Sequence, residues 1–204
     1  MKKSVSKEVI IQKASKIFVE QGAKTTVDEL SRNMKISKRT IYEQFEDKTD
    51  LLRECLVFLV KTLPEFPDVQ ENTDNQIPNI IQIVYDITIP LFGKKSRFIT
   101  EIYQQYPDLF TEQLSPYIAL LQKKMMENFT LCAKGGYVRP DITLELVMVC
   151  LLRVMYTVTF RTDGLLAKFS HRTIYMSIIL PYLRGLFTEK GIKFFDENVK
   201  KHLQ

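Results

Sequence analysis

Residues 26–52 read TVDELSRNMKISKRTIYEQFEDKTDLL, and this stretch decides the fold. Thr26 and Glu29 have the spacing of a capping box, in which each side chain bonds the other residue's backbone N–H at a helix start. Ser37 and Asp47 are good caps for two further helices. The apolar residues behind these caps recur at helical spacing and are Val27, Leu30, Met34, Ile41, Phe45, Leu51 and Leu52. We therefore expect a helix after each cap.

A helix before this stretch completes a three-helix unit. From about Lys7 onward the apolar side chains fall on one helical face, and Gly22 is a good residue to end that helix. The face carries Ile10, Ala14, Ile17 and Phe18. Three short helices joined by connections of about three residues have the spacing of a helix-turn-helix. The sequence predicts a helix-turn-helix DNA-binding domain over residues 1–50.

Positive charge is concentrated where a helix favours negative charge. Lys38 and Arg39 fall in the first turn of the expected third helix, where each cation opposes the helix macrodipole by ~0.3–1 kcal/mol. Arg32 and Lys35 lie nearby, and residues 30–42 contain no acid. DNA in contact with this surface explains the placement, because a recognition helix meets base edges from its N-terminal turn. The alternative is a solvated basic face.

Lys48 indicates a phosphate contact, and Tyr42 is expected at the surface. Lys48 follows the cap of the fourth helix. An anion at this position would accept hydrogen bonds from the free backbone amides and would also pair with the ammonium group. The aspartates that flank it at positions 47 and 50 are alternative partners. Tyr42 is either a core residue or an exposed one. Because Ile41 and Phe45 already fill the inward face, we expect Tyr42 to point outward.

The remaining sequence is typical of an ordinary helical protein. The chain has 204 residues, of which 45% are hydrophobic, and its net charge of +5 suits a polyanionic partner. Helical periodicity recurs throughout and strict strand-like alternation does not, so we expect an all-α fold. The three widely spaced cysteines, Cys55, Cys132 and Cys150, are expected to be free, buried thiols, with no metal site and no cofactor.

Targeting signals are lacking in the sequence. The N-terminus has no apolar signal segment. The longest apolar stretch, residues 146–160, is shorter than the ~20 residues that span a bilayer, and it contains Arg153. We expect a cytoplasmic protein with no membrane contact.

A second, larger helical domain is expected over residues 51–204. The fourth helix is expected over 48–63, and the Pro-containing, polar stretch 64–76 is expected to be a loop. Further helices are expected at 77–92, 96–106, 108–114, 116–134, 143–161 and 171–190, with a turn-rich link at 135–141 and a short amphipathic helix in 191–204.

A family resemblance is carried by residues 7–52. The matching positions are Ala14, Phe18, Gly22, Thr26, Val27, Leu30, the run ISKRTIYEQFEDK at 36–48, Leu51 and Leu52. This pattern resembles the DNA-binding domain of the TetR/AcrR (tetracycline-repressor) family. The stretches GYVRPD at 136–141 and LRGL at 183–186 look like the family's link and last-helix signature. The stretch 64–134 matches nothing diagnostic.

The resemblance implies roles for individual residues. Positions matching Thr26, Thr40, Tyr42 and Lys48 typically hold phosphates in the family. Positions matching Ser37, Lys38, Arg39 and sometimes Glu43 or Gln44 approach the groove. Lys35, also part of the expected DNA surface, stands where the family often has Gly. Either its backbone is left-handed, a conformation that side chains with a Cβ disfavour, or the turn differs slightly from that of the family.

An effector pocket is expected in the second domain. A supply of aromatic and Met side chains suits an apolar ligand, although such residues also form ordinary cores. The candidates are Phe98, Tyr103, Tyr106, Phe110, Tyr117, Met125, Phe129 and Arg153. If its apolar helix is buried, Arg153 needs a partner, unless its side chain reaches the surface.

A dimer interface is expected near the C-terminus. The helices at 143–161 and 171–190 carry more apolar surface than a small domain covers. The resemblance implies that they form a four-helix bundle with the same pair of a second subunit. Candidate interface residues are Cys150, Val154, Ile174, Ile178, Tyr182 and Gly185. Pro181 and Gly185 favour a kink or a close backbone approach, and a large monomeric core is the alternative.

The combined expectation is a homodimeric transcriptional regulator. It would be a repressor that a small, largely apolar effector releases from a palindromic operator in double-stranded DNA. One alternative is a ligand-independent architectural DNA-binding protein. Another is a helical-bundle enzyme, but the chain has no catalytic motif and its only histidines are His171 and His202. We therefore expect no catalytic residues.

Overall fold

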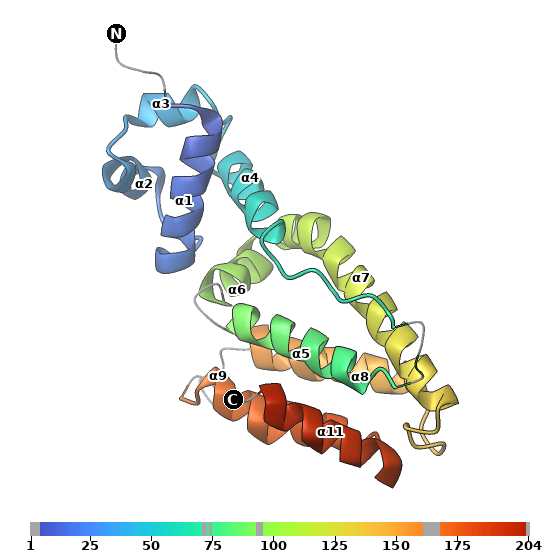
Figure 1. Ribbon diagram of the computed structural model, residues 1–204. Coiled ribbons are helices and arrows are strands. Elements are labelled where there is room, and N and C mark those ends of the chain that lie inside the picture. Colours follow the sequence, from blue (N-terminus) through green and yellow to red (C-terminus); the bar gives the residue numbers. More distant parts are fainter. Residues whose placement is uncertain (1–4, 71–72, 74, 93–95, 161–167, 203–204) are drawn as a thin grey trace. The chain divides into compact units, whose positions relative to one another are not determined.

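The computed structural model describes residues 5–70, 73, 75–92, 96–160 and 168–202 (Figure 1). Every regular element in these ranges is a helix, apart from one isolated antiparallel bridge between Val138 and Phe187. The all-α prediction is confirmed. In the same ranges, no helix is long and apolar enough to span a membrane.

The chain divides into two compact units. The first comprises Met1–Leu63 and Lys94–Tyr117, and the second comprises Pro64–Gly93 and Ile118–Gln204. The expected division after residue 50 therefore differs from the observed grouping, because the fourth helix and a later segment of the chain pack with the N-terminal helices.

The first unit holds the three N-terminal helices and two later ones. They are α1 (Lys7–Gln21), α2 (Val27–Met34), α3 (Lys38–Tyr42), α4 (Lys48–Val60) and α6 (Ser96–Gln105). α1 packs against α2, α4 and α6, and α2 packs against α3. The buried side chains come from all five helices and include Ile10, Ala14, Phe18, Leu30, Ile41, Leu52, Cys55 and Phe98. In this core α6, which lies downstream in the sequence, packs together with the N-terminal helices that include the expected DNA-binding helices α2 and α3.

The helix α7 (Pro107–Lys134) is continuous through Pro116, so the expected break between 114 and 116 is wrong. Proline within a helix costs about 3 kcal/mol, because it removes one backbone hydrogen bond and crowds the preceding turn. Buried side chains on both sides of the proline offset this cost: Leu109, Phe110 and Leu114 precede it, and Leu121 and Met125 follow it.

The second unit is built around α5 (Ile77–Phe92), which packs against α8 (Leu144–Phe160), α9 (His171–Ile174) and α11 (Glu189–His202). Isoleucines and a valine of α5 are fully or almost fully buried in its core. They lie among side chains of α7, α8 and α11, which include Phe129, Leu151, Met155 and Phe195.

The expected helix at 171–190 is interrupted. α9 leads into the π-helix η1 (Tyr175–Ile179) and then into α10 (Leu180–Arg184). Leu180 N–H donates to the carbonyl of Tyr175, and this wider turn stands directly before Pro181, which has no N–H to continue an α-helical ladder. The helix ends at Arg184, with Gly185 as its C-cap, and α11 begins at Glu189 rather than after 190.

The turn-rich link at 135–141 is fixed to the segment between α10 and α11. Thr188 Oγ1 donates to the carbonyl of Gly136 at 2.9 Å, and Thr188 N–H donates to the carbonyl of Tyr137 at 2.8 Å. Gly191 lies close to this contact. A Cβ added at position 191 would stand 2.9 Å from Phe187 Cβ. The two stretches that resemble family signatures therefore lie side by side.

Candidate nucleic-acid interface

The helix caps of the expected DNA surface form as the sequence predicts. Thr26 Oγ1 accepts from Glu29 N–H at 3.3 Å, and Glu29 Oε2 accepts from Thr26 N–H at 2.7 Å. Ser37 Oγ accepts from Thr40 N–H at 3.0 Å, and the two hydroxyl oxygens are 2.8 Å apart. Ser37, Thr26 and Thr40 therefore hold the helix starts in place.

The turn between α2 and α3 contains a left-handed residue. Lys35 has φ 56° and ψ 40°, and it is the one non-glycine residue with positive φ in the part of the chain that the structure describes. Its N–H donates to the carbonyl of Arg32 at 3.2 Å. A lysine in this conformation is strained, because its Cβ crowds the carbonyl oxygen.

Replacing Lys35 with Gly is expected to raise the free energy of unfolding by up to about 1 kcal/mol. The relief of left-handed strain exceeds the extra chain entropy that Gly loses on folding. Denaturant unfolding measures the change. Lys35→Ala removes the same charge but keeps the strain, so it is the matched control. Equal stability of the Gly and Ala variants would contradict the argument.

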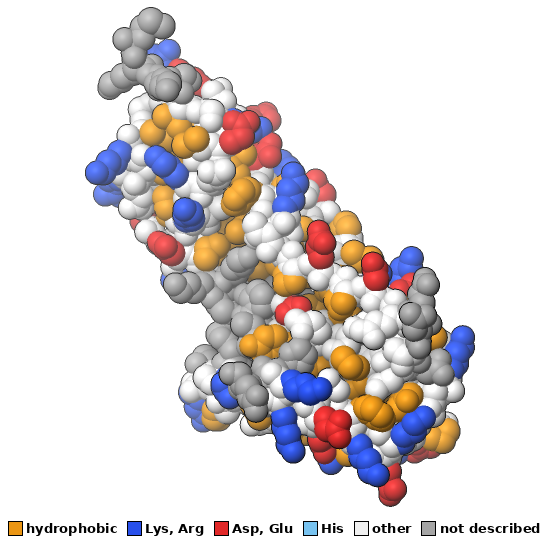
Figure 2. Space-filling model, in the orientation of Figure 1, with side chains coloured by type: hydrophobic (Ala, Val, Ile, Leu, Met, Phe, Trp, Pro, Cys, Tyr) orange, Lys and Arg blue, Asp and Glu red, His pale blue; other side chains and the backbone are white. Residues whose placement is uncertain are grey.

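Two cations of this surface form ion pairs that the sequence did not predict. Lys38 forms an ion pair with Asp28 of α2, and Arg39 Nε lies 2.9 Å from Glu43 Oε1. The Arg39 side chain is 88% exposed. Pairs this exposed are worth only about 0–1 kcal/mol, so a phosphate or base can replace the acid at little cost. Lys and Arg side chains stand out on the surface over α1 and α2 (Figure 2).

Tyr42 points outward, as expected. Its side chain is 52% exposed, whereas Ile41 and Phe45 on either side of it in the sequence are buried. No core contact therefore accounts for an aromatic residue at this position.

Lys48 is partly buried at the start of α4. Desolvation lowers the pKa of its ammonium group, and the negative charges of Glu101 and Glu29 oppose this shift. Glu101 belongs to α6, and nothing in the local sequence pattern indicates that it lies near Lys48.

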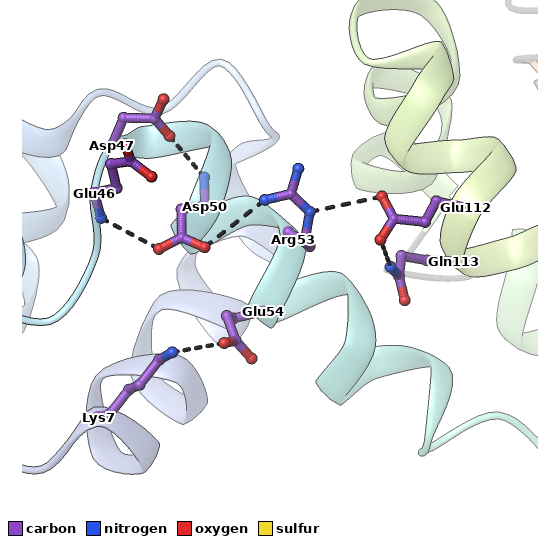
Figure 3. A network of polar contacts seen from close by, with 8 residues as sticks. All are labelled: Lys7, Glu46, Asp47, Asp50, Arg53, Glu54, Glu112 and Gln113. Carbon is purple, nitrogen blue, oxygen red and sulfur yellow. Dashed lines mark hydrogen bonds and ion pairs between the residues drawn. The ribbon is translucent and has the colours of Figure 1, made fainter.

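The aspartates flanking Lys48 have other partners (Figure 3). Asp47 Oδ1 caps α4 by accepting from Asp50 N–H at 2.7 Å. Asp50 accepts from Glu46 N–H at 3.2 Å and lies 3.8 Å from Arg53, which also lies 3.6 Å from Glu112 of α7. Lys7 of α1 binds Glu54 at 2.6 Å. This network ties α4 to its neighbours in the first unit.

Comparison with known proteins identifies the N-terminal region. The family model "Bacterial regulatory proteins, tetR family" matches residues 10–55, which include α2, α3 and most of α1. Residues 10–55 form a tetR-family domain. The resemblance seen in the sequence is confirmed. A comparison with curated proteins finds no match.

Solved tetR-family structures share the fold of the whole chain. A TetR regulator from Agrobacterium tumefaciens has a TM-score of 0.65 and 20% identity over 90% of this chain and 95% of its own. A TetR-family regulator from Marinobacter aquaeolei has a TM-score of 0.65 and 16% identity, covering 98% of each chain. PfmR from Thermus thermophilus has a TM-score of 0.55 and 19% identity over 86% of this chain and 97% of its own.

The expected pocket residues are divided between the two units. Five belong to the first unit and three to the second: Phe98, Tyr103, Tyr106, Phe110 and Tyr117, then Met125, Phe129 and Arg153. Phe98 stacks on Phe18 at 5.7 Å between ring centroids, and Tyr103 meets Phe110 edge-on at 5.1 Å. Phe129 is fully buried against Phe187, and Arg153 is exposed.

The second unit contains a small internal void and an open groove. The void, of about 10 Å³, is lined by apolar residues of α5, α7 and α8, including Met125, Met148 and Met155. The groove, of about 730 Å³, lies between Asp68–Val69 and α7. Of the expected pocket residues, Met125 lines the void.

The expected dimer residues fall on segments that contact each other. Tyr182 Oη donates to the carbonyl of Val147 at 3.4 Å, and Ile174 packs against Val154. Ile174 is buried, Ile178, Val154 and Tyr182 are partly buried, and Cys150 and Gly185 are exposed.

Two exposed residues of α8 were overlooked. Leu146 and Val149 are 63% and 56% exposed and share the outer face of α8 with Cys150. The expectation of a buried thiol is therefore wrong for Cys150, whereas Cys55 and Cys132 are buried. The same helical spacing of apolar residues would have identified this face.

Proposed function

We propose that this protein is a homodimeric transcriptional repressor that binds a palindromic operator through α2 and α3. One observation carries the proposal: Lys38, Arg39 and Tyr42 lie exposed on the short helix that Ser37 caps. The surface serves no packing purpose in the unit, yet it presents two cations and an aromatic hydroxyl. DNA provides a partner for all three groups.

The residues divide into two roles. Thr26, Thr40, Tyr42 and Lys48 contact phosphates and set the position of the domain on the duplex. Ser37, Lys38 and Arg39 approach base edges in the major groove, and Lys35 adds positive charge beside them. Arginine can bond both acceptors of a guanine, so Arg39 is the expected source of base preference.

Selection of sheared genomic DNA by the purified protein tests this function. At near-physiological salt we expect enrichment of a palindromic sequence, followed by loss of its binding when an apolar effector is added. Enrichment that no small molecule alters would favour the ligand-independent architectural protein. The absence of any enriched sequence would contradict the proposed function.

A second subunit is proposed to cover the outer face of α8. Leu146, Val149 and Cys150 form an exposed apolar surface there, and a palindromic operator requires two domains related by a two-fold axis.

Val149→Arg is expected to convert the dimer to a monomer at micromolar concentration, because it places charges of the same sign on both sides of a two-fold interface. Sedimentation measures the mass. Leu120→Arg, at an exposed position of α7, is the matched control. A dimer that survives Val149→Arg with unchanged stability would contradict the proposed interface.

We propose that the effector pocket forms by enlargement of the void between α5, α7 and α8. Its size is close to the space that one water needs, so an effector must displace side chains to enter. Three methionines in its wall have flexible, polarisable side chains that repack around apolar ligands. Binding would regulate DNA affinity only if the effector prefers one of two conformations.

A further inference from the structure

Glu101 of α6 lies against the loop that joins α1 to α2. Its Oε2 accepts from Lys24 N–H at 3.2 Å. Its other carboxylate oxygen stands 2.7 Å from the place where a Cβ on Gly22 would be. The Glu101 side chain is only 12% exposed. A carboxylate is therefore held against the backbone of a loop that lies far upstream in the sequence.

Gly22 is the residue that permits this approach. It has φ 96°, a conformation that side chains with a Cβ rarely adopt, and a Cβ would collide with the carboxylate. The absence of a Cβ at Gly22 therefore allows Glu101 to pack directly against the loop. The loop leads to Thr26, the cap of α2.

The remaining contacts of Glu101 fix its own position. Its Oε1 accepts from Arg97 Nε at 3.1 Å, one helical turn earlier on α6. Phe98 of the same helix stacks on Phe18 of α1. The negative charge of Glu101 also acts on Lys48, a proposed phosphate contact.

We propose that Glu101 is a positioning residue for DNA binding, which holds the α1–α2 loop and the start of α2 in the geometry that fits the operator. The inference rests on the proposed function. In sequence α6 lies between α5 and α7, so Glu101 belongs to a segment that leaves the second unit and returns to it. A change in the position of α6 would therefore reach the DNA surface through this carboxylate.

Comparison of Glu101→Gln with Glu101→Ala tests the inference. Both variants lose the charge, but only glutamine keeps an acceptor for Lys24 N–H. Because the lost hydrogen bond holds the loop, we expect the Ala variant to bind the operator about three- to tenfold more weakly than the Gln variant. The Gln variant is expected to bind at least as well as the wild type, because a negative charge near the phosphates is gone.

Amide hydrogen exchange of the free protein provides a readout that does not depend on DNA. Exchange at Lys24 is expected to be about tenfold faster in Glu101→Ala than in the wild type, and nearly unchanged in Glu101→Gln. Glu127→Ala is the matched control, because Glu127, like Glu101, pairs with a basic residue one turn earlier on its helix, here Lys123, but in the second unit. Its exchange at Lys24 and its operator affinity are expected to be those of the wild type.

The possible failures are distinguishable. If the wild type selects no DNA sequence, the proposed function fails and the positioning role fails with it. If the wild type binds an operator and the Ala and Gln variants bind equally well, Glu101 does not position the domain. Unchanged exchange at Lys24 in Glu101→Ala would show that the carboxylate does not hold the loop.

Discussion

Replacing both Tyr42 and Lys48 with alanine is expected to lower DNA affinity about a hundredfold per DNA half-site, and by the same factor for operator and random DNA. Each phosphate contact is worth roughly 1.4 kcal/mol, or tenfold, and the losses add when the two sites act independently. The uniform loss follows because phosphates carry no sequence information. Affinity is measured by titration of both DNAs.

The salt dependence separates the two residues. Lys48 carries a charge and Tyr42 does not, so the slope of log affinity against log salt is expected to fall by about 0.9 per DNA half-site, all of it from Lys48. A phosphate oxygen in direct contact would offset the desolvation that lowers the pKa of the Lys48 ammonium group.

Two controls define what the double variant shows. Lys123→Ala removes an exposed lysine of α7 from the second unit and is expected to leave affinity unchanged. Arg39→Ala is expected to reduce the preference for the operator over random DNA, because it removes the candidate base contact. Native affinity and an unchanged salt slope in the double variant would refute the assigned docking surface.

Replacing Phe129 with alanine is expected to lower the free energy of unfolding by about 3–5 kcal/mol. The ring is fully buried and stacks on Phe187, with centroids 6.0 Å apart and planes at 7°. Phe187 in turn meets Phe195 of α11 at 5.5 Å. Loss of the first ring therefore leaves a cavity at the centre of the second unit. Denaturant unfolding measures the change.

Phe194→Ala is the matched control for Phe129. Phe194 is 37% exposed and touches Tyr137 edge-on, so its loss is expected to cost less than about 1.5 kcal/mol. The result also decides between the two interpretations of Phe129. If the alanine variant keeps native stability but binds apolar compounds differently, the ring lines a pocket rather than supporting the core.

The local structure of the expected DNA surface could be predicted because the interactions that form it are local. Thr26, Ser37 and Asp47 each accept from a backbone N–H three residues ahead, so the sequence spacing alone specifies these bonds. The outward direction of Tyr42 follows from the helical position of Ile41 and Phe45. The left-handed backbone of Lys35 was one of two alternatives that the family resemblance indicated, because the family often has Gly at this position.

The packing partners of the aromatic residues could not be predicted from the sequence. Phe98 and Phe129 have similar surroundings in the sequence, yet one packs against α1 in the first unit and the other lies in the core of the second. Helical periodicity states which face of a helix is apolar. It does not state which other helix covers that face, because many pairings bury a similar apolar area.

The sequence by itself therefore determined the all-α class, the N-terminal helices α1 to α4 with the caps of α2, α3 and α4, the outward direction of Tyr42, and the family of the N-terminal domain. Only the tertiary structure decided the pairing of Lys38 with Asp28, the continuity of α7 through Pro116, and the contact of Glu101 with the α1–α2 loop. Caps and periodicity depend on residues within one or two helical turns. The other contacts join segments whose meeting depends on the packing of the entire unit, and no local pattern of residues carries that information.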